Sequence, residues 1–246
     1  MIIDACCTVG LESDDEPTAD ELVRLMDAQQ VDAAVLHVPD RCYAWDNQPG
    51  NAMLAQVSQD HPQRFIPTAT TNPWRQDAWD VLHRAIEAGA EMLSFAPAVQ
   101  GFVLGDHRLD RICEELAKHY STLPIFIHTG HHSNATPAQL LLLANRFPSL
   151  NFIMGHSGSS DYKTDVVPVC SVCSNIYPES SFARPPGFLD IAGQFGWDRA
   201  IMGSGFPYND FEQEWLVMRD QAPAVHADAL LGGNLARLIG AGANTC

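Results

Sequence analysis

Short runs of apolar and β-branched residues alternate with longer stretches of helical periodicity along the chain, and this alternation restricts the fold more than any other feature. The runs begin roughly every 30 residues, which is the length of one βα unit. The expected strands are Ile2–Cys6, Ala33–Val38, Phe65–Thr70, Met92–Ala96, Pro124–His128, Asn151–His156, Asn175–Glu179 and Arg199–Gly203. Eight βα units close a (β/α)8 barrel, so the pattern predicts an α/β protein of the TIM-barrel class.

A doubly wound open sheet shows the same alternation and is the alternative fold. The dinucleotide-binding form of that fold carries a glycine fingerprint after its first strand, and this sequence has none there. Polar residues instead follow several strands, as expected where the C-terminal ends of all strands surround one site. No shift in composition marks a boundary, so we expect a single domain over residues 1–246.

Two helix starts are predicted from their capping residues. Thr18 and Glu21 have the spacing of a capping box, and Thr136 and Gln139 repeat it with a proline at the first helical position. The closing stretch 226–240 has helical periodicity that two adjacent glycines at 232 and 233 interrupt. We therefore expect helices after residues 18 and 136 and a broken helix near the C-terminus.

Composition and charge exclude several classes of partner. Hydrophobic residues make up 46% of the chain and charged residues 18%, which is typical of a globular protein. A net charge of −16 without any cluster of Lys or Arg argues against nucleic acid and anionic membranes as partners. No apolar run approaches the roughly 18–20 residues of a membrane span, and the N-terminus has no signal-like pattern. Seven cysteines, an odd number, argue against a full disulfide framework, so we expect a cytoplasmic protein. With nucleic acid and membranes excluded, the expected partner is a small molecule.

Two histidines stand at the ends of neighbouring expected strands. His128 and His156 each close an apolar run, and small residues that leave room for a ligand follow both. A neutral imidazole there can bind a divalent metal or act as an acid or base. A structural histidine is the alternative for either one alone, and the matched positions favour a functional pair. His131 and His132 lie on the loop after the fifth strand, where they line the site or face solvent.

The cysteines allow more than one interpretation. Cys6 and Cys7 are adjacent in the first strand, so the alternation of side chains lets only one of them face the barrel mouth. Each is either a small buried hydrophobic residue or a thiol activated by an imidazole. Cys170 and Cys173 have a C-x-x-C spacing with no second pair, which is a weak signal for zinc or redox chemistry.

Several stretches carry a resemblance to a known family. "IFIHTG", "RFPSLNFIMGHSG", "RAIMGSGFP" and "GGNLARLIG" resemble, in order, the fifth strand, sixth strand, eighth strand and terminal helix of the amidohydrolase-related branch of the amidohydrolase superfamily. "IIDACCTVG" is similar to its first strand. The resemblance implies hydrolysis or decarboxylation of a small carboxylate, lactone or amide-like molecule. It also implies a divalent metal, typically zinc or manganese, and a possible homo-oligomer.

The resemblance also implies site residues, of which this chain keeps only a part. The family's metal is held by a His-x-His pair, a histidine after strand five and an aspartate after strand eight, and its strand-six histidine orients the substrate. His128 and His156 match the last two histidines. The His-x-His pair falls on Cys6 and Thr8, and the aspartate falls on Gly205. A basic residue frequent on strand four falls on Ser94.

Three hypotheses follow. In the first, Cys6 and His128 hold zinc together with His156, His128 and His156 are catalytic, and Asp161 or Asp210 replaces the missing base. In the second, the barrel has lost its metal and binds a small molecule or a partner protein without turnover. In the third, His128 or His156 acts without metal, with Cys6 or Cys7 as nucleophile. The expected substrate contacts are His131, Ser94 and Ser204, and Asp4 is expected to be structural. The family favours a hydrolase or decarboxylase.

Overall fold

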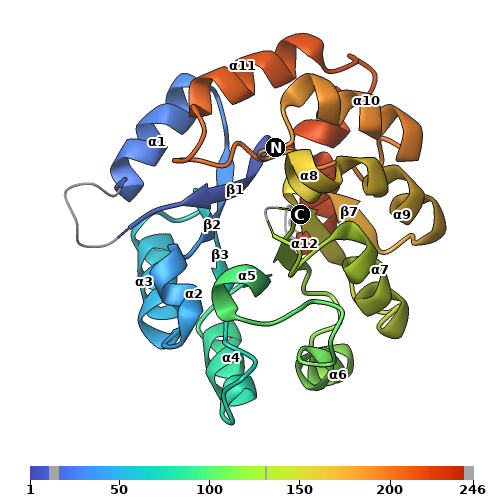
Figure 1. The fold of residues 1–246 in the computed structure, drawn as a ribbon. Coiled ribbons are helices and arrows are strands. Elements are labelled where there is room, and N and C mark those ends of the chain that lie inside the picture. The colour runs from blue at the N-terminus through green and yellow to red at the C-terminus, as the bar shows by residue number, and fades with distance from the viewer. Residues whose placement is uncertain (11–16, 131, 241–246) are drawn as a thin grey trace.

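Seven parallel strands form the centre of the molecule and pair in the order in which the chain makes them (Figure 1). The computed structural model describes residues 1–10, 17–130 and 132–240. The strands are β1 (Ile3–Thr8), β2 (Ala33–His37), β3 (Phe65–Ala69), β4 (Met92–Phe95), β5 (Ile125–His128), β6 (Phe152–Gly155) and β7 (Ile176–Pro178). Seven of the expected strands are therefore confirmed, with ends that differ by one or two residues.

The eighth expected strand, Arg199–Gly203, is not a regular strand, but its segment still closes the ring. Ile201 forms an isolated bridge with Glu179, and Phe206 forms one with Cys7 of β1. The N–H of Thr8 donates to the carbonyl of Phe206 at 2.8 Å. Gly205, between these two bridges, has φ +77°, so the backbone leaves the extended region before Phe206. The fold is a TIM barrel whose eighth strand is irregular.

Helices follow the strands and surround the sheet (Figure 1). They are α1 (Ala19–Ala28), α2 (Asp40–Ala44), α3 (Gln48–Asp60), α4 (Ala78–Glu87), α5 (Pro97–Gln100), α6 (Asp110–His119), α7 (Pro137–Arg146), α8 (Ser159–Tyr162), α9 (Val166–Val172), α10 (Pro185–Phe195), α11 (Phe211–Gln221) and α12 (Asn234–Ile239). Short 3-10 turns lie at His156–Gly158 and Lys163–Asp165, and a π-helical turn lies at Ala229–Gly233. None of the described helices has both the length and the apolar character needed to traverse a bilayer.

The predicted capping residues start α1 and α7. The hydroxyl of Thr18 accepts from the N–H of Glu21, whose side chain returns a hydrogen bond to Thr18. Thr136 and Gln139 form the same reciprocal pair. The C-terminal helix is broken at Gly232, as expected, where the backbone is non-helical, and a Cβ at this position would collide with the backbone of residues 1–3. The helix starts and the broken terminal helix are thus confirmed.

Alternation along the strands decides which side chains enter the barrel. Phe126 of β5 belongs to the inner apolar cluster, whereas its neighbours Ile125 and Ile127 pack with the cluster beneath the helices. The inner face repeats every second residue, so His128 lies on the same face as Phe126. By the same period, His37 follows the inward Val35. The barrel interior therefore ends in polar side chains at its C-terminal mouth.

The two adjacent cysteines separate between these clusters. The pairing of β1 with β2 shifts register between Asp4 and Cys7. Cys6 belongs to the inner cluster, whereas Cys7 belongs to the outer one and lies 3.8 Å from the hydroxyl of Ser204. Ala5 and Cys6 both belong to the inner cluster, so the register shift interrupts the alternation here, and of the two cysteines only Cys6 lines the pocket.

Candidate functional site

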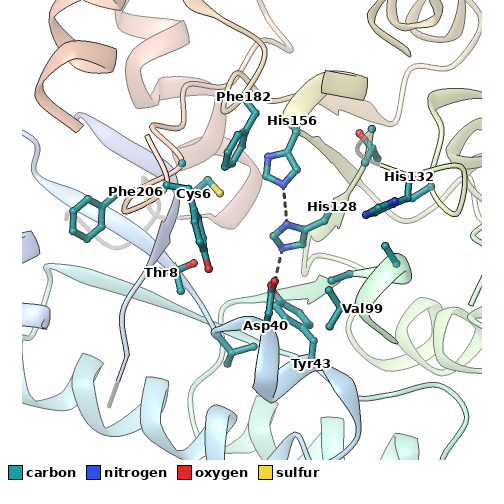
Figure 2. Close-up of a pocket in the computed structure, with 18 residues that line it drawn as sticks. Cys6, Thr8, Asp40, Tyr43, Val99, His128, His132, His156, Phe182 and Phe206 are labelled. Atoms are coloured by element: carbon teal, nitrogen blue, oxygen red, sulfur yellow. Dashed lines mark hydrogen bonds between the residues drawn. The ribbon is translucent and has the colours of Figure 1, made fainter. Parts of the chain in front are cut away.

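A pocket of about 310 Å³ opens at the C-terminal ends of the strands, where TIM barrels carry their sites. Figure 2 shows His128 and His156 at its centre, with Cys6, Phe182 and Phe206 on one side and Tyr43 and Val99 below. The lining residues are Cys6, Thr8, Val38, Asp40, Tyr43, Ala96, Ala98, Val99, His128, Thr129, Gly130, His132, Ala135, His156, Phe182, Gly205, Phe206 and Tyr208. The wall is mostly apolar with a small polar group at its centre.

His128 and His156 form a direct pair in this pocket. The Nδ1 of His128 lies 2.9 Å from the Nε2 of His156 (Figure 2). The backbone of His156 has φ +65°, and that of Ser157 has φ +41°, so both residues occupy the left-handed region. Such conformations cost about 1–3 kcal/mol each and persist where the surroundings hold them. Here the N–H of His156 donates to the buried Glu179 carboxylate at 2.9 Å.

Beyond His128 the hydrogen bonds run back into the barrel and end at a backbone carbonyl. The Nε2 of His37 lies 3.0 Å from the carbonyl of Ala5, which can only accept, so this nitrogen carries the proton. The Nδ1 of His37 must then accept from the hydroxyl of Ser94, 2.9 Å away. Burial lowers the pKa of His37 to about 4, so the ring is neutral at physiological pH, in agreement with this assignment.

The same logic sets the proton on His128. Because Ser94 donates to His37, its oxygen accepts from the phenol of Tyr43 at 2.6 Å. The Tyr43 oxygen in turn lies 3.1 Å from the Nε2 of His128, which must donate to it. Burial raises the pKa of Tyr43 well above its usual value, so the phenol keeps its proton. A neutral His128 therefore accepts at Nδ1 from the Nε2–H of His156.

On the other side, His156 is joined to a buried carboxyl through one hydroxyl. The Nδ1 of His156 lies 2.7 Å from the Oγ of Ser181, which donates to the Oε2 of Glu179 at 2.7 Å. Glu179 is fully buried, and desolvation raises its pKa to about 7. In one arrangement His156 is an imidazolium beside a carboxylate. If the Ser181 hydroxyl reverses, both groups are neutral. We call Glu179, Ser181, His156 and His128 the proton relay.

Gly205 explains how an aromatic side chain comes to cover this relay. A Cβ at position 205 would lie 2.9 Å from the Nδ2 of Asn209 and 3.1 Å from the Cε2 of Phe182. The ring of Phe182 packs edge-on against His156, with centroids 4.9 Å apart. The position where the resemblance implies an aspartate therefore has no side chain, and Phe182 lies against it.

A match to a family profile over most of the chain identifies the family. A profile described as Amidohydrolase matches residues 26–241. The chain belongs to the amidohydrolase family. No curated protein sequence matches this amidohydrolase.

Solved structures of similar fold support the architecture. An uncharacterized TIM-barrel protein from Bordetella bronchiseptica has a TM-score of 0.79 at 17% identity, over 97% of this chain and 98% of that one. A 2,6-dihydroxybenzoate decarboxylase from Rhizobium has a TM-score of 0.76 at 14% identity, over 98% and 99%. A dihydroxybenzoic acid decarboxylase from a Polaromonas species, with bound manganese and the inhibitor 2-nitroresorcinol, has a TM-score of 0.79 at 16% identity, over 98% and 97%. At these identities the likeness concerns the fold.

The residues of this family member do not fit the divalent metal that the family implies. Within residues 1–10, 17–130 and 132–240, no three His, Cys, Asp or Glu side chains gather in a way that could hold an ion. Both ring nitrogens of His128 are hydrogen-bonded, Nδ1 to His156 and Nε2 to Tyr43. Burial, and after it the Glu179 carboxylate, raises the pKa of the Cys6 thiol well above its usual range. The set of Cys6 with His128 and His156 stays a prediction that this geometry does not support.

Burial likewise raises the pKa of the Cys7 thiol far above its usual range. Neither Cys6 nor Cys7 is therefore an activated nucleophile. Cys170 and Cys173 are free thiols on or next to α9, and Arg199 donates to the carbonyls of both.

Two of the three predicted substrate contacts lie outside the pocket wall. Ser94 and Ser204 are fully buried and are not part of the pocket wall. The hydroxyl of Ser94 is hydrogen-bonded to both His37 and Tyr43, and that of Ser204 accepts from the N–H of Phe206. His131 lies outside the described residues, whereas its neighbour His132 lines the pocket. These positions support no substrate contact for Ser94 or Ser204.

Neither Asp161 nor Asp210, the carboxylates predicted to replace the missing base, lies in the pocket wall. Asp210 caps α11 by accepting from the N–H of Gln213 at 3.0 Å, and Asp161 lies on α8 outside the pocket wall. Asp4 is structural, as expected, because it accepts from the N–H groups of Cys6 and Ser204 and from the indole of Trp215. The buried carboxylate of the site is Glu179 instead.

Sequence reasoning missed Glu179, Ser181 and Tyr43, and left His37 without a role. Glu179 is two residues beyond Tyr177, which packs with the inner cluster, so its inward direction follows from strand alternation. A charged residue at the end of an expected strand is the signal that identifies it. Tyr43 lies on α2, beyond the strand, and no local pattern places its phenol beside His128.

Proposed function

We propose that this amidohydrolase is an enzyme that hydrolyses or decarboxylates a small organic molecule in the pocket, with the proton relay in place of a metal. The observation that supports it is the unbroken hydrogen-bond chain from a buried carboxyl with a pKa of about 7 to two imidazoles on the pocket wall. A group that titrates near neutral pH can both give and take a proton during turnover. The decarboxylase structures of similar fold agree with this reaction class.

Each member of the relay has a proposed role. His156 lines the pocket and is the acid–base group that exchanges a proton with substrate or water. Ser181 and Glu179 are positioning residues that supply and store that proton, because neither lines the pocket. His128 orients His156 through its Nδ1 and is itself held by Tyr43. The roles of His128 and His156 as catalytic residues stay predictions.

The test is turnover after removal of metal. Protein dialysed against a chelator is assayed on a panel of aryl carboxylates, lactones and cyclic amides. We expect turnover to persist, and His156→Gln to lower kcat by about 10²–10⁴-fold, the usual contribution of a general acid–base group. Ser181→Ala should remove the step near pH 7 from the rate profile, whereas Ser171→Ala, at an exposed position on α9, should leave the profile unchanged. Loss of turnover with the chelator and its recovery with manganese would overturn the proposal.

A binding protein without turnover is the second candidate. It is favoured by the direct bond between His128 and His156, which satisfies both rings without a substrate, and by Thr8 and Gly205 at two positions of family metal ligands. It predicts saturable binding of a panel compound with no product formed at any pH. Product formation would exclude it.

We further propose a reducing, cytoplasmic setting for this chemistry. The six cysteines within the described residues are all free thiols. Self-association stays a prediction from the family.

A further inference from the structure

The pocket wall offers no fixed positive charge to a ligand. None of its described residues is Lys or Arg. Asp40 lies exposed at the rim, Glu179 is buried behind His156, and the chain as a whole has a net charge of −16. An anion that leaves water for this site would lose its hydration without gaining an opposite charge, which costs several kcal/mol.

The imidazoles of the proton relay do not change this balance, because His156 is coupled to Glu179, and the third imidazole of the wall, His132, lies outside the relay. When Ser181 donates to Glu179, the imidazolium of His156 is paired with a carboxylate. When the hydroxyl reverses, both groups are neutral. The relay therefore has no net charge in either arrangement and becomes negative once the pair has lost a proton as the pH rises through 7, so it never presents a net positive charge to a carboxylate.

The aromatic and aliphatic lining of the pocket favours a flat ligand. Phe182, Phe206 and Tyr208 form an aromatic side, and Val38 and Val99 contribute aliphatic surface to the wall. Phe182 lies within 6.3 Å of Tyr208, centroid to centroid, and stands perpendicular to His156. Aromatic side chains of this kind pack well against a ring, and about 310 Å³ is a volume for a small compound.

We propose that the pocket selects an uncharged planar ring compound over a ring carboxylate. This inference rests on the proposed function and chooses its hydrolytic branch, with a lactone or cyclic amide as substrate class. With Glu179 ionised and the Nδ1–H of His156 bonded to Ser181, the Nε2 of His156 would turn from His128 and take a proton from water while the water oxygen bonds to the acyl carbon. The ring C–O or C–N bond would then break, and the leaving atom would take the proton back from His156. The ring opens to a carboxylic acid that loses its proton to solvent, and the same charge balance would help to expel the resulting carboxylate.

Three probes of one shape and different charge test the selection. Benzamide, benzoate and benzamidine are titrated at pH 8 and followed by NMR shifts of the protein. We expect benzamide to bind at least about tenfold more tightly than benzoate, because only the latter brings an unpaired charge. Cyclohexanecarboxamide, which is uncharged but not planar, should bind more weakly than benzamide. Benzamidine is a cation and should not show the loss of affinity that benzoate shows. Benzoate binding as tightly as benzamide, benzamidine binding as weakly as benzoate, or no binding of benzamide would overturn the inference.

A lysine at the pocket wall provides the converse test. Val99 is 38% exposed and lines the pocket, and Val225 is 87% exposed and does not, so both positions tolerate a surface residue. Val99→Lys should raise the affinity for benzoate by about tenfold, since it supplies the missing partner charge. Val225→Lys makes the same change in net charge and should alter neither affinity. An unchanged benzoate affinity in Val99→Lys would show that charge does not set the selection.

The proposed selection and the proposed enzyme activity can be refuted independently. If benzamide is preferred but no lactone or amide is converted, the enzyme proposal fails and the selection stands. If an aryl carboxylate is converted and benzoate binds more tightly than benzamide, the enzyme proposal stands and the selection is overturned.

Discussion

Glu179 shows how strongly one residue's surroundings set its chemistry. Both of its oxygens accept backbone N–H groups, from Ser181 at 2.7 Å and from His156 at 2.9 Å. These bonds favour the carboxylate, yet desolvation outweighs them and raises the pKa to about 7. A Cβ on Gly203 would collide with this carboxylate, so the glycine makes room for it. Sequence alone indicates a carboxyl at this strand end, and only burial makes it a group that titrates near neutral pH.

Glu179→Gln should change the pH dependence of stability. The folded-state pKa of about 7 lies above the ordinary value of 4.5, so the folded protein holds this proton more tightly than the unfolded chain. The contribution of this bound proton to the free energy of unfolding is full below pH 4.5 and is lost as the pH rises through 7. The free energy of unfolding of the unmodified protein should thus fall, relative to Glu179→Gln, by up to about 3 kcal/mol across that range.

Urea denaturation of both proteins at several pH values measures this difference. The comparison removes contributions that the two proteins share, among them that of His37. A difference that stays constant from pH 4 to 8 would contradict the raised pKa.

At the scale of elements, a buried side chain adds to the backbone hydrogen bonds that hold the irregular eighth segment. The Oδ1 of Asp4 in β1 accepts from the N–H of Ser204 at 2.9 Å and from that of Cys6 at 3.0 Å, while Oδ2 accepts from the indole of Trp215 in α11 at 2.8 Å. One buried carboxylate therefore joins the first strand, the closing segment and a helix. Ser204 and Trp215 lie about 200 residues from Asp4 in sequence, so sequence patterns do not reveal these two hydrogen bonds.

Asp4→Ala should loosen the closure of the barrel. It leaves buried donors without an acceptor, at a cost of about 3–5 kcal/mol. Hydrogen exchange read by mass spectrometry should show lost protection in residues 199–206 before other strands. Asp4→Asn keeps one accepting oxygen for the two backbone N–H groups, and only its amide N–H faces the indole donor of Trp215. The protection of residues 199–206 in this variant should lie between that of the unmodified protein and that of Asp4→Ala, and the variant should remain folded. Equal protection in all three would contradict a closing role for Asp4.

At the scale of the whole molecule, the donor set predicts that metal does not stabilise the protein. A family-type site with a Kd near 1 µM would add about 4 kcal/mol at 1 mM metal, or a rise in Tm of about 8–16 °C for a chain of this size. We expect manganese and zinc to produce no such rise, and elemental analysis to find less than stoichiometric metal. A stoichiometric metal that disappears in Cys6→Ala and His128→Ala would restore the predicted metal site.

The sequence by itself determined the barrel, the capped starts of α1 and α7, the broken terminal helix, and the positions of His128 and His156 at neighbouring strand ends. These features depend on period, capping and backbone freedom, which act over a few residues. Only the tertiary structure decided that Tyr43, Ser181 and Glu179 complete the site and that Ser94 and Ser204 are buried beneath it. The physical reason is that hydrogen-bond partners and desolvation arise between strands that meet only when the barrel closes.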